Sequence, residues 1–208
     1  MGIRKEKAAK LKLVILDQAQ KMTGKRSFDD LHVDQLCKKV KISKVTFFKY
    51  FPQKEDLLLY HFRLWCLDRV VELNQKPKEG SEALYLLFDR LSEECEKYPG
   101  MMLALVAYLS DLKRTPRPFP VKAEEKILLY PNVIDIHKVE ILSLDQLIEK
   151  FVLEGIFKKQ ITKTSSTKDI TNLLIGIFYG SILTAHLRQL SPLKITFRRN
   201  LDLVLKSL

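Results

Sequence analysis

The sequence contains little of what marks a disulfide scaffold or a sheet protein. It has only 3 cysteines in 208 residues, at positions 37, 66 and 95, and no CxxC pair. This excludes a disulfide framework and indicates reduced, structural thiols in a reducing compartment. Only 7 Gly and 8 Pro are present, so sharp turns are few and long helices are favoured over many short strands. We therefore expect an all-α fold.

Long hydrophobic runs are also missing. The most apolar segment, residues 173–185, is LLIGIFYGSILTA, shorter than the ~20 residues of a membrane helix. The apolar run at residues 13–16 is too short for the core of a signal peptide. We expect a cytoplasmic protein without a membrane partner. The hydrophobic content of 46% is enough for a substantial core.

Catalytic and metal-binding motifs are absent as well. The sequence has no GxSxG, GxGxxG, Walker loop or HExxH, each of which supplies a nucleophile, a phosphate cradle or a metal site. The four histidines, at positions 32, 61, 137 and 186, lack the spacing of metal ligands. Cap, core and surface roles explain them better. We expect no enzyme activity, no metal and no cofactor.

Positive charge is concentrated near the N-terminus. The net charge is +11, and residues 1–60 hold 14 Lys and Arg against 7 Asp and Glu. The other 148 residues hold 22 Lys and Arg against 18 Asp and Glu. A basic module joined to a nearly balanced one suggests a polyanionic partner. A solvated, lysine-rich surface would give the same numbers, and charge alone does not separate the two interpretations.

Apolar periodicity predicts about nine helices. Gly24 is a plausible helix stop, Ser43 and Thr167 are suitable N-caps, and the proline-rich residues 114–120 must be extended. The predicted helices cover residues 5–23, 33–40, 43–51, 53–75, 81–97, 101–112, 136–157, 167–190 and 195–206, and a short additional helix is expected at 121–129.

The most informative segment is residues 33–58, VDQLCKKVKISKVTFFKYFPQKEDLL. Two short amphipathic helices around a tight turn form a helix-turn-helix, whose second helix reads the major groove. Phe47 and Phe51 at i, i+4 would face inward. The outer face would carry Lys44, Val45, Thr46, Phe48 and Lys49, flanked by Tyr50 and Lys54. Lysines reach phosphates or guanine, Thr46 can reach a phosphate, and Val45 can touch a thymine methyl.

This segment resembles the TetR family of bacterial transcription regulators, whose pattern reads roughly TVxxIAxxAGVSxGTxYxYFxxKExL. The matching positions are Val33, Leu36, Val40, Ile42, Ser43, Thr46, Tyr50, Phe51, Lys54, Glu55 and Leu57. With the helix before it, the resemblance covers residues 5–60. It implies DNA contacts by His32, Ser43, Lys44, Val45, Thr46, Phe48, Lys49, Tyr50 and Lys54, with His32 where the family often has a capping Thr.

Three positions depart from the family pattern. The turn glycine is Lys41, the glycine of the recognition helix is Val45, and the first tyrosine is Phe48. A non-glycine residue in the left-handed conformation costs on the order of 1 kcal/mol, so a different turn shape is expected. The DNA contacts at positions 45 and 48 are expected to differ from the family's.

By the same resemblance, residues 1–52 are the DNA-binding domain and residues 53–208 an effector-binding and dimerisation domain. Gly176, Gly180 and Thr184 fall at i, i+4, i+8, a stripe that permits close approach of the twofold mate or close packing within one subunit. A partly apolar effector could contact Met and aromatic side chains, although core packing also explains each of them. The candidates are Trp65, Phe88, Met101, Met102, Tyr108 and Tyr179.

Together these features predict a homodimeric repressor that binds a near-palindromic operator in double-stranded DNA and is released by a small-molecule effector. The alternative is a helical small-molecule or lipid-binding protein of the same fold with weak or no DNA binding. Salt-dependent DNA binding separates the two.

Overall fold

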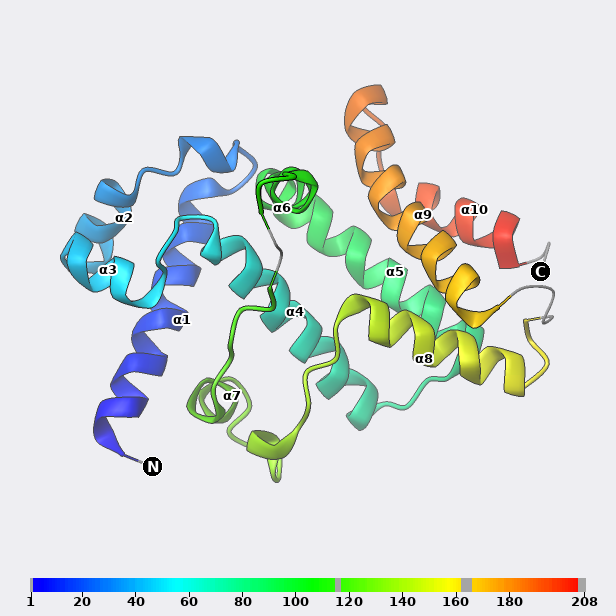
Figure 1. Ribbon diagram of the computed structural model, residues 1–208, viewed down its shortest axis with the longest axis horizontal. Helices are drawn as coiled ribbons and strands as arrows, with labels where there is room; N and C mark the ends of the chain where they lie inside the picture. The colour runs from blue at the N-terminus through cyan, green and yellow to red at the C-terminus, as the bar shows by residue number, and fades with distance from the viewer. Residues whose placement is uncertain (1, 115–116, 162–165, 206–208) are drawn as a thin grey trace. The chain divides into compact units, whose positions relative to one another are not determined.

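The protein is built from helices, as the computed structural model in Figure 1 shows; it describes residues 2–114, 117–161 and 166–205. Within these ranges it contains ten α-helices, two short 3-10 helices and no strand, which confirms the all-α prediction. The count exceeds nine because the short segment before Tyr130 is a regular α-helix, Ala123–Leu129.

The helices are bounded as follows. The first half of the chain contains α1 (Ile3–Thr23), η1 (Phe28–Asp30), α2 (Val33–Val40), α3 (Lys44–Tyr50), α4 (Asp56–Gln75) and α5 (Gly80–Lys97). The second half contains α6 (Pro99–Ser110), α7 (Ala123–Leu129), η2 (Ile136–Lys138), α8 (Leu144–Phe157), α9 (Thr167–Arg188) and α10 (Leu193–Leu205). α1 ends at Gly24, as predicted, with φ +52° and its N–H donating to the Gln20 carbonyl.

The chain divides into two compact units. One comprises Met1–Trp65 and Tyr98–Ile141, and the other Cys66–Lys97 and Leu142–Leu208. In the first unit, α1 packs against α2, α6 and α7, and α2 packs against α3. The predicted boundary at residue 52 stays a prediction, but the first unit contains more than the helix-turn-helix, since α6 and α7 belong to it.

A close backbone approach ties α6 to the loop after α1 within the first unit. A Cβ atom on Gly100 would lie 1.7 Å from the Arg26 carbonyl oxygen, so only glycine fits at this position. The N-terminus of α6 therefore rests directly on the chain that leads into η1 and α2.

In the second unit, α5 packs against α8 and α10, and α9 packs against the same two helices. Its core is largely aromatic: the Phe88 and Phe197 rings meet edge-to-face at 5.3 Å, and Phe178 lies 6.2 Å from Phe197. All three side chains are at most 1% exposed. Burying such rings supplies much of the stabilisation of a unit this small.

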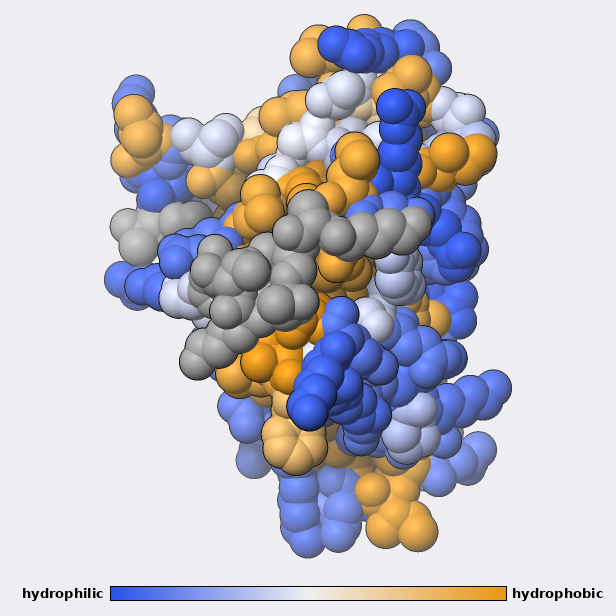
Figure 2. Space-filling view, turned by 90° about the vertical axis from the view of Figure 1, so that its right-hand side faces the viewer, coloured by the Kyte–Doolittle hydropathy of each residue, from blue (hydrophilic) through white to orange (hydrophobic). Residues whose placement is uncertain are grey.

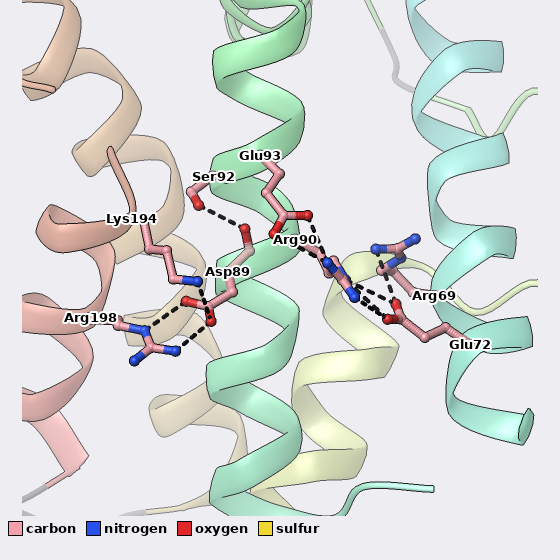
Figure 3. Close-up of polar contacts among 8 residues, drawn as sticks. All are labelled: Arg69, Glu72, Asp89, Arg90, Ser92, Glu93, Lys194 and Arg198. Carbon is pink, nitrogen blue, oxygen red and sulfur yellow. Dashed lines mark hydrogen bonds and ion pairs between the residues drawn. The ribbon is translucent and has the colours of Figure 1, made fainter. Parts of the chain in front are cut away.

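Polar contacts fasten α5 to helices on both sides, as Figure 3 shows. Asp89 accepts two hydrogen bonds from Arg198 of α10, at 2.8 and 2.5 Å, and pairs with Lys194 at 3.0 Å. On the opposite side, Arg90 binds Glu72 of α4 at 2.6 Å. Burial alone would raise the pKa of the Asp89 carboxyl, but the hydrogen bonds and charges of Arg198 and Lys194 outweigh it and lower that pKa.

Two details of the predicted helices were wrong. The expected helix over 136–157 is interrupted, because Ser143 begins α8: its Oγ accepts from the Gln146 N–H at 3.2 Å, and Gln146 Oε1 accepts from the Ser143 N–H at 2.8 Å. This capping box satisfies amides that an uninterrupted helix would bond differently. At α9 the cap is Ser166 rather than Thr167, with Oγ accepting from the Asp169 N–H at 3.1 Å.

Within the described part of the chain, α9 is long and apolar enough to cross a membrane by length and composition. The core helix of a soluble protein passes the same test. Its buried side chains, which include Ile170, Leu174 and Phe178, face α8 and α10.

Candidate nucleic-acid interface

The turn between α2 and α3 keeps its shape without glycine. Lys41 has φ 59° and ψ 49°, a left-handed conformation. Its N–H donates to the Lys38 carbonyl at 3.3 Å, and the Ile42 N–H donates to the Cys37 carbonyl at 3.0 Å. These bonds satisfy the last carbonyls of α2, as in a glycine-terminated helix. The left-handed turn therefore forms with lysine at this position, at a cost of about 1 kcal/mol.

Ser43 starts the recognition helix, as predicted. Its Oγ accepts a hydrogen bond from the Thr46 N–H at 3.1 Å and lies 2.9 Å from Thr46 Oγ1. The cap fixes where α3 begins, and so which side chains point outward. Thr46 is half-buried and its hydroxyl already engages Ser43, so any phosphate contact at this position shares that hydroxyl.

The inner face of α3 is aromatic. Phe47 and Phe51 are fully buried, with their ring centroids 5.7 Å apart. Phe51 stacks on Phe119 at 5.5 Å and lies 5.6 Å from Tyr60 of α4. These contacts anchor α3 from below and confirm the predicted phase of the helix.

The outer face of α3 presents the side chains that the sequence predicted. Val45 is 81% exposed and Phe48 44% exposed, and Lys44 and Lys49 are exposed beside them. Lys44 Nζ forms an ion pair with Asp34 of α2 at 2.6 Å. Such a surface pair contributes little to stability, so a phosphate or a guanine can replace Asp34 at low cost.

Two predicted contact residues are placed differently from the rest. Lys54 is half-buried and turned toward η1, where Nζ donates to the Phe28 carbonyl at 3.3 Å and lies 4.9 Å from the centre of the Phe28 ring. It holds the start of α4 against η1. His32 occupies the N-cap of α2 without a side-chain cap hydrogen bond and is exposed.

A buried polar cluster beneath α1 was not found by sequence reasoning. Glu125 of α7 accepts from Lys12 of α1 and from the Tyr60 hydroxyl, the latter at 2.7 Å. Burial lowers the pKa of Lys12, although the hydrogen bond and charge of Glu125 act in the opposite direction. Burial, with the Glu125 charge and hydrogen bond in addition, raises the pKa of Tyr60. A residue separation of 113 leaves no local signal for this pair.

The candidate effector residues lie in both units. Met101, Met102 and Phe88 are at most 1% exposed, and Trp65 is 4% exposed. Trp65 stacks on Phe62 at 5.5 Å, Arg114 lies over the Tyr108 ring at 4.5 Å, and Tyr179 lies 4.9 Å from Phe178. Their role toward a ligand stays a prediction.

The candidate dimer stripe lies on the outside of α9. A Cβ atom on Gly176 or Gly180 would meet no described atom within 4 Å. Successive residues turn by 100° on a helix, so Leu173 and Leu187, 48% and 79% exposed, extend the same stripe at its two ends. Figure 2 shows apolar side chains exposed on the face that this view presents. At these two glycines, no described residue packs against the helix surface, whereas Thr184 is half-buried.

These features define a helix-turn-helix protein with a second helical unit. Residues 15–60 match the family described as "Bacterial regulatory proteins, tetR family". This match confirms the resemblance drawn from the motif. No curated protein matches the chain in sequence.

Solved structures show that the whole chain shares the fold of such regulators. The regulator FadR from Bacillus subtilis, crystallised with stearoyl-CoA, aligns with a TM-score of 0.62 at 17% identity over 94% of this chain and 98% of FadR. The reduced form of NemR from E. coli aligns with a TM-score of 0.58 at 14% identity, over 91% of this chain and 95% of NemR. A TetR regulator from Rhodococcus sp. RHA1 gives 0.53 at 15% identity, covering 99% of each.

Proposed function

We propose that the protein is a cytoplasmic transcription regulator that represses its target by binding a near-palindromic operator as a homodimer. The observation that carries this proposal is the build of α3. Two fully buried phenylalanines hold the helix from below, while Lys44, Val45, Phe48 and Lys49 stand on its outer face. Cationic and small apolar groups on one helix face suit the acceptors and thymine methyls of the major groove.

Dimerisation supplies the second half-site contact. A near-palindromic operator requires two reading heads one DNA turn, or ~34 Å, apart. The free stripe of α9, from Leu173 through Gly180 to Leu187, supports this arrangement because an apolar, glycine-lined helix face permits close approach of a twofold mate. The exposed Ile195 and Leu203 of α10, at 64% and 65%, add apolar surface on the neighbouring helix.

A partly apolar effector would release the protein from DNA. Flexible methionine and aromatic side chains suit such a ligand, and FadR, which has the same fold, was crystallised with stearoyl-CoA. Release requires that the effector bind one conformation more tightly than the other. Long-chain acyl compounds are therefore suitable first probes, with a rise in Tm and a loss of DNA binding as paired readouts.

The experiment that tests the proposal is selection from a random duplex library with the purified full chain, followed by anisotropy titrations of the enriched sequence. We expect enrichment of an inverted repeat whose half-site centres are ~10 base pairs apart. Its log affinity should fall linearly with log salt, by roughly 0.9 per neutralised phosphate. Failure to enrich any sequence, with normal folding, would favour the small-molecule or lipid-binding alternative.

A further inference from the structure

A small hollow of about 250 Å³ opens beside the reading helix, within the first unit. Its walls come from the first turns of α1, the end of α3 and the start of α7. The helix-turn-helix forms one of these walls, through α3, and α7 lies more than 60 residues further along the chain. No motif in the sequence indicates this site.

The inner wall of the hollow carries no net charge, and hydrogen bonds and an ion pair hold its side chains in place. Lys12 and Glu125 line it, but they form an ion pair with each other. The second oxygen of the Glu125 carboxylate accepts from the Lys122 N–H at 2.7 Å. Lys12 and Glu125 are 7% and 1% exposed. This buried pair thus fixes the start of α7 against α1 without adding net charge.

The rim of the hollow is cationic. Arg4 and Lys5 of α1, Lys49 of α3, and Lys122 before α7 line it, with Glu124 as the one further carboxylate. All four cations are exposed, and in the described ranges none makes an ion pair within 4.0 Å. The cations in Figure 3 differ, since Arg90, Lys194 and Arg198 each engage a carboxylate.

We propose that this hollow binds a phosphate group. Four cations from three segments surround one small space, none of them ion-paired to another described residue, and the half-buried Tyr50 also lines it. Guanidinium and ammonium groups form strong charge-assisted hydrogen bonds to phosphate oxygens. The volume lies below the ~300–1,000 Å³ of sites for drug-sized ligands, which suits a phosphate with little attached to it.

Two sources can supply that phosphate. The first is the operator backbone next to the bases that α3 reads; this source rests on the proposed function, and it would make Lys122 a DNA contact outside the helix-turn-helix. The second is a free phosphorylated small molecule, which would occupy Lys49 and so compete with DNA. The chemistry of the site is the same in both cases.

Calorimetry tests the site itself. Inorganic phosphate is titrated into the full chain at constant ionic strength, with chloride as the balancing anion. We expect saturable binding that weakens about tenfold in Lys122→Gln and in Arg4→Gln, since each loses a charge-assisted hydrogen bond. Lys10→Gln is the matched control, because Lys10 is exposed on the opposite face of α1 and should bind phosphate like the wild type.

The site is refuted if wild-type protein shows no saturable phosphate binding, or if Lys10→Gln loses as much affinity as Lys122→Gln. Circular dichroism confirms that each variant is folded. Because this titration contains no DNA, its result does not depend on whether the chain is a regulator.

Titrations with the selected operator then identify the source. If the phosphate is that of DNA, Lys122→Gln should lower operator affinity and reduce the salt slope by about one. If the phosphate is free, Lys122→Gln should keep the wild-type slope, and inorganic phosphate should displace DNA from the wild type but less from the variant. Both results support the site. A chain that binds phosphate but no DNA would contradict only the proposed function.

Discussion

At the scale of single residues, the exposed lysines of α3 are the proposed DNA contacts. We expect Lys44→Ala or Lys49→Ala to weaken operator binding by about 1–3 kcal/mol if the lysine contacts a base. If it contacts a phosphate, affinity should fall alike for all sequences and the salt slope should decrease by about one. Anisotropy titrations over a salt series measure both, with Lys10→Ala as control. Wild-type affinity in both variants would show that α3 is not the reader.

Phe47, the buried phenylalanine beneath these lysines, stabilises the fold rather than contacting DNA. Phe47 is fully buried and touches Phe51, so Phe47→Ala should cost ~3–5 kcal/mol of unfolding free energy. Phe48→Ala, at a 44% exposed neighbour, should cost far less. The single tryptophan, Trp65, is buried in the same unit, and its fluorescence can follow denaturation. Equal stability of the two variants would contradict the observed phase of α3.

At the scale of elements, the contacts of Asp89 in α5 with Lys194 and Arg198 in α10 make the free energy of unfolding depend on pH. The pKa of the Asp89 carboxyl in the folded protein lies below the ordinary value of an aspartate. The contacts of Asp89 with Lys194 and Arg198 therefore contribute fully above pH ~4, and their contribution is lost as pH falls through the folded pKa. Asp89→Asn should cost about 1–3 kcal/mol near neutral pH, because a charged hydrogen-bonded pair is broken.

Urea denaturation of the wild type and of Asp89→Asn at pH 3–7 measures this contribution. The difference in unfolding free energy should shrink below pH 4. Asp17→Asn is the control, because the exposed Asp17–Lys21 pair should contribute little at any pH. A difference that stays constant down to pH 3 would show that packing, rather than the carboxylate charge, holds α10.

At the scale of the whole molecule, the free stripe on α9 is expected to form the dimer. Gly180→Leu should split the dimer without unfolding the subunit, since a Cβ at this position meets no described atom and leucine favours a helix over glycine by several tenths of a kcal/mol. Light scattering over a concentration series measures the mass. Operator affinity should fall with the dimer, because one head makes half the contacts.

His186→Leu provides the control for Gly180→Leu. His186 is exposed and lies about 120° around α9 from the stripe, given 100° per residue. This variant should remain dimeric with normal DNA binding. If Gly180→Leu is also wholly dimeric at low micromolar concentration, the interface lies on another surface.

The sequence by itself determined the features that depend on near neighbours. The helix-turn-helix, the Ser43 cap, the inward phase of Phe47 and Phe51, and the Gly24 stop were all predictable, because apolar periodicity and caps act over three or four residues. The break before α8 was also readable, since Ser143 and Gln146 form a local capping box. The predicted continuous helix overlooked that signal.

Only the tertiary structure decided the features that join distant segments. Lys12 meets Glu125 because α7 packs against α1, and Asp89 meets Arg198 because α10 packs against α5. The same dependence on packing turned Lys54 toward η1 and placed Lys122 and Lys49 around one hollow. It also left Gly176 and Gly180 without a described neighbour within 4 Å of an added Cβ. Periodicity shows which face of a helix is apolar, but it does not specify the partner, since many helices offer equivalent faces and the chain order alone does not choose among them.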